Sequence, residues 1–281
     1  MLKEYAKIRV ISIATVVLIL LIPLASAGTY IVDGCLDDWG INSTDLQYGL
    51  GSSTNISYWL PTNSTVDWIV ENDIDPDCTG YCTLHPCYDY GVHVKGRGGS
   101  YWDYDEGCNY PQGGEKYDIE ALYFDDNTTH CFFAIIVSDI NLTGDLKITI
   151  DGVKYGVVLT DHDGLLQGAV YKNPGWAQYP DGSGSHDPQD PYVDPNNPGE
   201  YQGMATVVIS PSGVYDHQWN NWIIEIGIEK SLIGYPSVGT PSYVRYTISC
   251  LNDKISNEIR FDYPIPEFLV LLLPIGLILG V

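Results

Sequence analysis

The segment that decides the fold is YDIEALYFDDNTTHCFFAIIVSDINLTGDLKITIDGVKYGVVLT, residues 117–160. It divides into four runs that are rich in β-branched and aromatic residues and that alternate with a period of two, as strands do. The second run is apolar on both faces, which is typical of a strand in the middle of packed layers. The pattern predicts a central meander of strands at Tyr117–Phe124, His130–Ser138, Asp145–Ile150 and Lys154–Thr160.

The rest of the chain contains further strand patterns separated by turn signals. Their spacing predicts an all-β fold, an antiparallel β-sandwich of jelly-roll or immunoglobulin-like type with long irregular loops. Residues 164–202 are rich in Pro and Asp and are expected to form one of these loops. The expected elements are strands at Tyr30–Val32, Ile56–Leu60, Gly203–Ser210, Trp222–Ile228, Tyr243–Leu251 and Lys254–Tyr263, and a helical turn at Glu229–Gly234.

Apolar segments lie at both ends of the chain. Three basic residues precede the apolar run Val10–Leu24 and the small residues Ala25-Ser26-Ala27, which predicts a helical secretory signal peptide over residues 1–27. An uncleaved N-terminal anchor is the alternative. Residues 264–281 end in the apolar run Phe268–Val281, which predicts a hydrophobic C-terminal helix for sorting or membrane attachment. The ectodomain between them spans residues 28–263.

The net charge of the chain is −23, from 36 acidic and 13 basic residues. Such an acidic body repels the phosphate backbone, so nucleic acid is excluded as a partner. The composition instead suits an outer surface exposed to solvent, or cation binding.

All seven cysteines follow the leader, and an exported compartment favours disulfides. Their odd number leaves one free or intermolecular thiol. Residues 71–114 form a Cys-rich insertion, which we expect to be stapled by local disulfides. A zinc site that uses these thiols with His85 is the alternative, although the matching second ligand pair is missing. The cysteines are Cys35, Cys78, Cys82, Cys87, Cys108, Cys131 and Cys250.

Five N-x-S/T sequons predict glycosylation at the surface. One of them lies in the turn Asp125–Thr129 between two expected strands, where a glycan has room. The sequons begin at Asn42, Asn55, Asn63, Asn127 and Asn141.

The C-terminal sequence Pro266-Glu267-Phe268, followed by an apolar segment, resembles the PEF-CTERM sorting signal of methanogenic archaea. The resemblance implies recognition of this triplet by an archaeosortase-like enzyme that removes the tail and leaves the protein on the cell surface. The basic cluster that normally follows the apolar segment is missing after Val281.

Five short motifs are spread over the body of the chain: Asp33-Gly34-Cys35-Leu36-Asp37-Asp38-Trp39, Tyr117–Tyr123, Gly144-Asp145-Leu146, Tyr171-Lys172-Asn173-Pro174 and Cys250-Leu251-Asn252-Asp253. With these motifs the body resembles surface proteins with a DOMON-like or family 9 carbohydrate-binding sandwich. The resemblance implies a sandwich that often binds sugar or calcium.

Sugar binding requires a flat aromatic face together with carboxylates or amides for the hydroxyl groups. Trp59, Trp68, Trp102, Trp176 and Trp219 lie in expected loops or near their ends. We expect Trp102 and Trp176 to contact ligand, with Asp103 and Asn173 beside them. The alternative is that a loop Trp closes the end of the sandwich. Trp39 and Trp222 are expected in the core.

Calcium suits an acidic extracellular sandwich and needs several oxygen ligands. One candidate cluster is Asp73, Asp75 and Asp77, another is Asp161 with Asp163, and Asp125-Asp126-Asn127 is a third. The first cluster is not an EF-hand loop, because Cys78 stands where the loop requires Gly. Acidic turns without an ion are the alternative.

Enzyme signatures such as G-x-S-x-G, H-E-x-x-H and the P-loop are absent from the sequence, and its six histidines show no partner pattern. The sequence therefore predicts a non-enzymatic module on the cell surface. The first hypothesis is binding of envelope glycans, and the second is a structural envelope protein that contacts surface-layer proteins or copies of itself.

Overall fold

The computed structural model describes residues 30–41, 59–72, 92–95, 119–216, 219–251 and 253–264. The expected terminal helices and most of the insertion at 71–114 lie outside these ranges. Within them, no helix has the length and apolar composition needed to cross a membrane.

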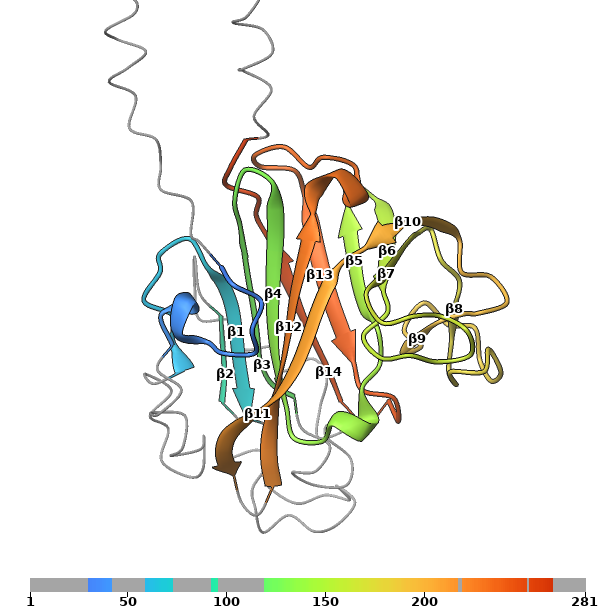
Figure 1. Cartoon of the computed structure of the whole chain (residues 1–281), viewed down its shortest axis with the longest axis horizontal. Helices are drawn as coiled ribbons and strands as arrows, with labels where there is room; N and C mark the ends of the chain where they lie inside the picture. The colour runs from blue at the N-terminus through green and yellow to red at the C-terminus, as the bar shows by residue number, and fades with distance from the viewer. Residues whose placement is uncertain are drawn as a thin grey trace, which may run out of the picture.

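The described part is an all-β structure of two six-stranded antiparallel sheets (Figure 1). A small third sheet pairs β8 (Trp176–Ala177) with β9 (Tyr192–Val193). The first sheet has the order β11 (Thr206–Asp216), β12 (Trp219–Glu229), β4 (His130–Val137), β3 (Ile119–Asp126), β1 (Asp67–Asn72) and β2 (Val92–Lys95). The second sheet has the order β10 (Glu200–Met204), β7 (Ala169–Lys172), β6 (Val153–Val157), β5 (Leu146–Ile150), β13 (Ser242–Thr247) and β14 (Lys254–Ile259).

The main core lies between the two large sheets. Alternate residues of β4, such as Phe133 and Ile135, point into it and meet Ile148 of β5 and Tyr246 of β13. These side chains are at most 1% exposed. The period of two places the remaining residues of each strand on the outer face. The sequence pattern of β4, apolar on both sides, therefore requires a second cover outside the first sheet.

That cover comes from the N-terminal part of the described chain. Trp39, in the 3-10 turn η1 (Asp37–Trp39), and Trp59 pack on Tyr123 and Ile136 of the outer face, and all four are buried. The predictions of core positions for Trp39 and of an internal place for β4 are confirmed. The alternating pattern of β4 thus reports two separate hydrophobic clusters, one on each side of the strand.

A buried carboxylate on β12 holds this N-terminal cover in place. Glu225 Oε2 accepts hydrogen bonds from the backbone N–H groups of Asp33 (2.9 Å) and Gly34 (2.8 Å). Its Oε1 accepts a hydrogen bond from Trp39 Nε1–H at 3.0 Å. Gly34 has φ +82°, and a side chain there would meet Ser210, so the turn requires glycine. The motif from Asp33 to Trp39 has a structural role.

Several sequence predictions of elements are wrong. Tyr30–Val32 forms no strand, because it runs over the outer face of the first sheet and pairs with no other strand. Trp59 and Leu60 are also outside any strand, whereas β1 was not predicted. The four central strands are no single meander: β3–β4 and β5–β6 are hairpins in different sheets, joined across the core by the 3-10 turn η7 (Ile140–Leu142).

The expected strand Gly203–Ser210 is divided between two sheets. The chain leaves β10 at Met204 and enters β11 at Thr206, so one residue joins the edges of the two sheets. The helical turn is confirmed as η8 (Lys230–Ile233). The Pro- and Asp-rich stretch 164–202 contains β7, β8, β9 and the beginning of β10, so it is far less irregular than predicted.

Replacement of Glu225 by Ala tests the attachment of the N-terminal cover. The change leaves two buried N–H donors and one partly buried N–H donor without their acceptor, which should lower the free energy of unfolding by roughly 2–5 kcal/mol. Glu229→Ala is the matched control, because Glu229 lies on the same strand and is exposed. Urea unfolding of both variants measures the difference. An equal, small effect of the two changes would contradict the anchoring role.

Candidate functional site

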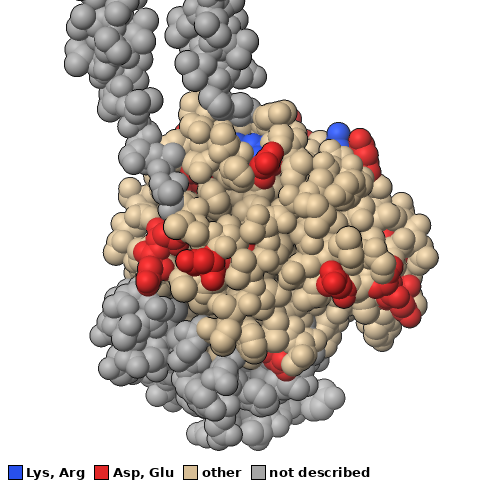
Figure 2. All heavy atoms as spheres, viewed as in Figure 1, with Lys and Arg blue, Asp and Glu red and all other residues tan. Residues whose placement is uncertain are grey.

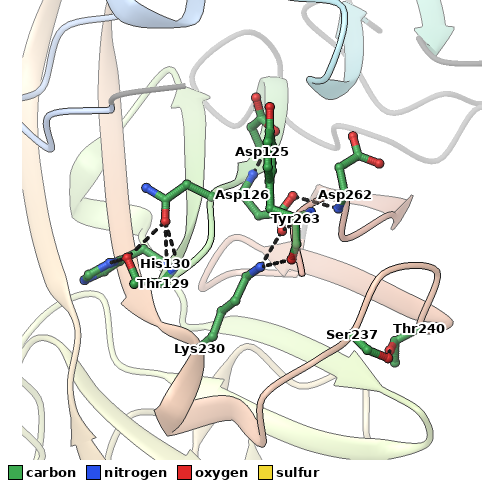
Figure 3. Close-up of polar contacts among 10 residues, drawn as sticks. Asp125, Asp126, Thr129, His130, Lys230, Ser237, Thr240, Asp262 and Tyr263 are labelled. Carbon is green, nitrogen blue, oxygen red and sulfur yellow. Dashed lines mark hydrogen bonds and ion pairs between the residues drawn. The ribbon is translucent and has the colours of Figure 1, made fainter. Parts of the chain in front are cut away.

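Two adjacent carboxylates at the end of β3 hold both ends of the described chain. Tyr30, at its N-terminal end, donates a hydrogen bond from Oη to Asp125 Oδ2. Asp126 accepts hydrogen bonds from the backbone N–H groups of Asp262 (2.9 Å) and Tyr263 (3.3 Å), near its C-terminal end (Figure 3). We call Tyr30, Asp125, Asp126, Lys230 and Tyr263 the terminal clasp. It places both described ends at the same end of the two sheets.

A buried ion pair lies at the centre of the terminal clasp. Lys230 Nζ lies 2.6 Å from Asp126 Oδ2 and donates a second hydrogen bond to the carbonyl of Tyr263 at 2.8 Å (Figure 3). Both side chains are at most 1% exposed, and the ammonium lies 5.4 Å from the centre of the Phe261 ring. Burial raises the pKa of the Asp126 carboxyl, against the opposing effect of its hydrogen bond with Lys230.

A second buried carboxylate organises the outer face of the second sheet. Asp145 Oδ1 accepts the N–H of Leu159 at 3.0 Å, and Oδ2 accepts the N–H of Val193 at 2.8 Å. His162 Nε2 lies 2.9 Å from the same Oδ2, and its side chain is only 5% exposed. Burial lowers the pKa of His162, but the hydrogen bond and charge of Asp145 outweigh it, so the pKa is raised overall. Asp145 therefore ties strand β9 to the sheet.

Trp176 packs on this face of the second sheet and is buried rather than exposed to solvent. It is 7% exposed, and Lys147 Nζ lies 4.3 Å from the centre of its ring. Gly156 of β6 provides the space, because a Cβ there would lie 3.2 Å from Trp176 and 2.6 Å from Val193. Burial lowers the pKa of Lys147 to about 7, with Arg245 adding to the effect. Trp176 is therefore a packing residue here, which was the alternative to its predicted role as a ligand contact.

The exposed aromatic surface lies further along the same face. Tyr171 of β7 and Tyr201 of β10 are direct cross-strand partners, and their rings meet edge to face with centroids 5.7 Å apart. Tyr201 is 56% exposed and Met204 is 48% exposed. The pairing register shifts between Tyr201 and Gly203, so that Tyr201 pairs with Tyr171 and Met204 pairs with Ala169, and both partners pack in the hydrophobic cluster around Trp176. We call Tyr171, Tyr201 and Met204 the aromatic patch.

The other predicted sugar contacts are not assembled around Trp176. Asn173 has φ +51° and sits in the turn after β7, where its Oδ1 lies 3.4 Å from the N–H of Lys154. Trp59 is 1% exposed and belongs to the N-terminal cover. Trp102 and Asp103 lie outside the described residues. The aromatic patch was missed because Tyr201 was assigned to an irregular loop, and because regular alternation would place Tyr201 and Met204, three residues apart, on opposite faces.

The candidate calcium ligands are separated in the part of the chain that the structure describes. Asp161 Oδ1 accepts the N–H of Gln167 at 2.6 Å, and Asp163 is exposed in the same turn with φ +37°. No group of three or more His, Cys, Asp or Glu residues is placed to hold an ion within the described ranges. Asp125 and Asp126 belong to the terminal clasp. Asp73, Asp75 and Asp77 lie outside the described residues, so calcium there stays a prediction.

The cysteines that are described correct part of the disulfide prediction. Cys131 is a free thiol buried in the main core, where burial raises its pKa, and Cys35 is a free thiol at the surface. They lie on opposite faces of the first sheet, which explains why they are not paired. Cys250 is exposed. The positions that lie outside the described residues are Cys78, Cys82, Cys87 and Cys108, together with the sorting residues Pro266, Glu267 and Phe268.

The described sequons differ in how their amide groups are used. Asn127 Oδ1 accepts the N–H groups of Thr129 (2.9 Å) and His130 (2.8 Å), so its Nδ2 points away from the turn. Asn141 is exposed, and its Nδ2 donates to Asp139. Asn63 Nδ2 donates to the carbonyl of Asp38 at 3.0 Å. Asn42 and Asn55 lie outside the described residues. Glycosylation stays a prediction for all five.

No protein-family model, curated protein or solved structure matches this chain. The DOMON-like and PEF-CTERM resemblances therefore stay predictions.

Replacement of Lys230 by Met tests the terminal clasp. The Asp126 carboxylate would stay buried without its cation, which should lower the free energy of unfolding by about 3–5 kcal/mol. Lys154→Met is the control, since Lys154 is exposed on β6. Denaturant unfolding followed by Trp fluorescence gives both values. A loss no larger than that of the control would show that the pair is not needed for stability.

Replacement of His162 by Gln tests the Asp145 site through its pH dependence. Because the folded pKa of His162 is raised, its charged form stabilises the fold fully below the ordinary imidazole pKa of 6.5, and this contribution is lost as pH rises through the folded pKa. The wild type should therefore exceed the variant in unfolding free energy at pH 6 by more than at pH 8.5. Lys147 has the opposite pH trend, but it is present in both proteins.

His186→Gln is the control for this experiment. His186 lies in the same stretch, and its side chain is 60% exposed. Its replacement removes an exposed imidazole from the same part of the chain, so the difference between the two variants gives the contribution of the buried His162 side chain. Identical profiles for the wild type and the His162 variant would exclude a stabilising charge on His162.

Proposed function

We propose that this protein is an exported module, attached to the cell surface, that binds neutral glycans through the aromatic patch on its second sheet. The cross-strand pair of Tyr171 and Tyr201 is the observation that supports glycan binding. The terminal clasp and the terminal segments support attachment to the cell surface.

The aromatic patch has the chemistry that sugar binding requires. The apolar face of a sugar ring stacks on an aromatic ring, and nearby polar groups bind its hydroxyls. Tyr201 offers an exposed ring that Tyr171 supports edge to face. The net charge of −23 disfavours anionic sugars, so neutral glycans are the class that fits.

The terminal clasp supports attachment at one end of the module. Pro264, the last described residue, follows Tyr263, and residues 265–281 carry the apolar run of the expected sorting tail. Asp126 and Lys230 fix the chain immediately before that tail. Tyr30 lies close to the expected cleavage site after Ala27 and is held by the neighbouring Asp125. A domain with both described ends at one side can be attached there while the aromatic patch stays exposed.

A structural role in the envelope is the second candidate function. It is supported by the edge strand β11 of the first sheet, which pairs with β12 alone among the described strands.

Replacement of Tyr201 by Ala tests glycan binding at the aromatic patch. With the full chain recovered from the membrane fraction of an exporting cell and neutral oligosaccharides as probes, the dissociation constant should rise at least about tenfold, equivalent to 1.4 kcal/mol. Tyr235→Ala is the matched control, because Tyr235 is also 56% exposed but belongs to the turn after η8 and is not a member of the aromatic patch. Titration calorimetry measures the affinity.

The possible failures are distinguishable. Equal affinity of the two variants would remove the aromatic patch as the site, and no binding to any neutral glycan would remove the glycan proposal. Absence of the protein from the membrane fraction would contradict attachment to the membrane, and it would not bear on glycan binding.

A further inference from the structure

The side of the molecule formed by β10 and β11 contains an uncovered strand edge. β11 is the last strand of the first sheet and pairs with β12 alone among the described strands. Its regular part runs from Thr206 to Ser210, before the register shift that begins at Pro211. An edge strand of this kind presents unpaired N–H and C=O groups on its outer side.

Both faces of this segment are already occupied within the molecule. Val207 and Ile209 pack against the main core between the two sheets. On the other face, Ser210 Oγ donates to the carbonyl of Gly34 at 2.6 Å, and Val208 lies beside the same turn. What β11 can offer a partner is therefore its backbone edge, and strand addition is the contact that fits.

The segment is also free of charge in a strongly acidic chain. No charged residue occurs between Glu200 and Asp216. The face in Figure 2 has groups of acidic side chains at its left and right, with an uncharged area between them where Figure 1 places β11 and β12. Because copies of an acidic protein repel each other, close approach costs least at such an area.

The other sheet edges carry charges or irregularities that the segment Thr206–Ser210 of β11 lacks. β14 contains Lys254 and Glu258, and the backbone N–H after it, at Arg260, bonds to Asp67 of β1 at 2.7 Å. β10 begins with Glu200 and is interrupted by a register shift, and β2 ends in Lys95. Charges and bulges on edge strands prevent sheets from pairing with one another. Among these edges, β11 is the one suited to association.

We propose that a second copy of this chain pairs with Thr206–Ser210, antiparallel and β11 against β11. The two first sheets, six strands each, then form one continuous sheet of twelve strands. Such a contact is symmetric, so Val208 lies opposite Val208 of the second copy, and it closes as a dimer. The inference does not rest on glycan binding, and it gives the structural envelope role a defined contact.

Sedimentation velocity of the full chain in detergent, over a range of protein concentrations, tests the dimer. The wild type should shift from monomer to dimer as concentration rises. Val208→Lys places a charge in the symmetric contact and should raise the dissociation constant at least about tenfold. Val238→Lys is the matched control: it makes the same change at a 54% exposed valine between η8 and β13, and it should dimerise like the wild type.

A second variant and a second measurement keep the test decisive. If Val208→Lys unfolds, Thr206→Lys replaces it, because Thr206 is exposed on the same edge. Hydrogen exchange should show that amides of 206–210 become protected as concentration rises. A wild type that stays monomeric overturns the proposal. So does dimerisation that the edge variants leave unchanged, or that Val238→Lys weakens as much as they do.

Discussion

The structure depends on the burial of both faces of the central strands β3, β4 and β12. One face meets the second sheet, and the other meets the N-terminal cover, so neither cluster exists without a segment distant in sequence. At about 25 cal/mol per Å² of apolar surface, this double burial is the largest stabilising contribution available to an all-β chain of this size. It also explains why the chain between the expected signal peptide and β1 carries Trp39 and Trp59 instead of a simple linker.

Buried carboxylates perform the joining role that the sequence suggested for disulfides. Glu225, Asp126 and Asp145 each accept hydrogen bonds from backbone N–H groups of segments far away in the chain. Only Asp126 is paired with a buried lysine. In a protein with 36 acidic and 13 basic residues, backbone amides are the more available partners for a buried acid. Hydrogen bonds to a charged acceptor are stronger than neutral ones, so each carboxylate can fix a whole segment.

One of these carboxylates, Asp145, also determines that Trp176 is buried. Asp145 binds β9 to the second sheet and thereby seats Trp176 over Gly156 and Lys147. The most prominent aromatic residue of the long Pro- and Asp-rich stretch is consequently buried. The exposed Tyr201 and its partner Tyr171 lie on the neighbouring strands β10 and β7, and the uncharged edge strand β11 begins one residue after β10 ends.

The sequence by itself determined the strands β3, β4, β5, β6, β12, β13 and β14 and the internal position of Trp39, because alternation and β-branched residues are local properties. It could not assign the strands to sheets, since a hairpin pattern is the same whichever sheet it joins. It also could not tell that Asp126, Asp145 and Glu225 are buried anchors, because their partners are backbone groups up to 192 residues away. Only the tertiary structure decided that Trp176 is covered while Tyr201 is exposed, since exposure depends on which distant segment packs against each face.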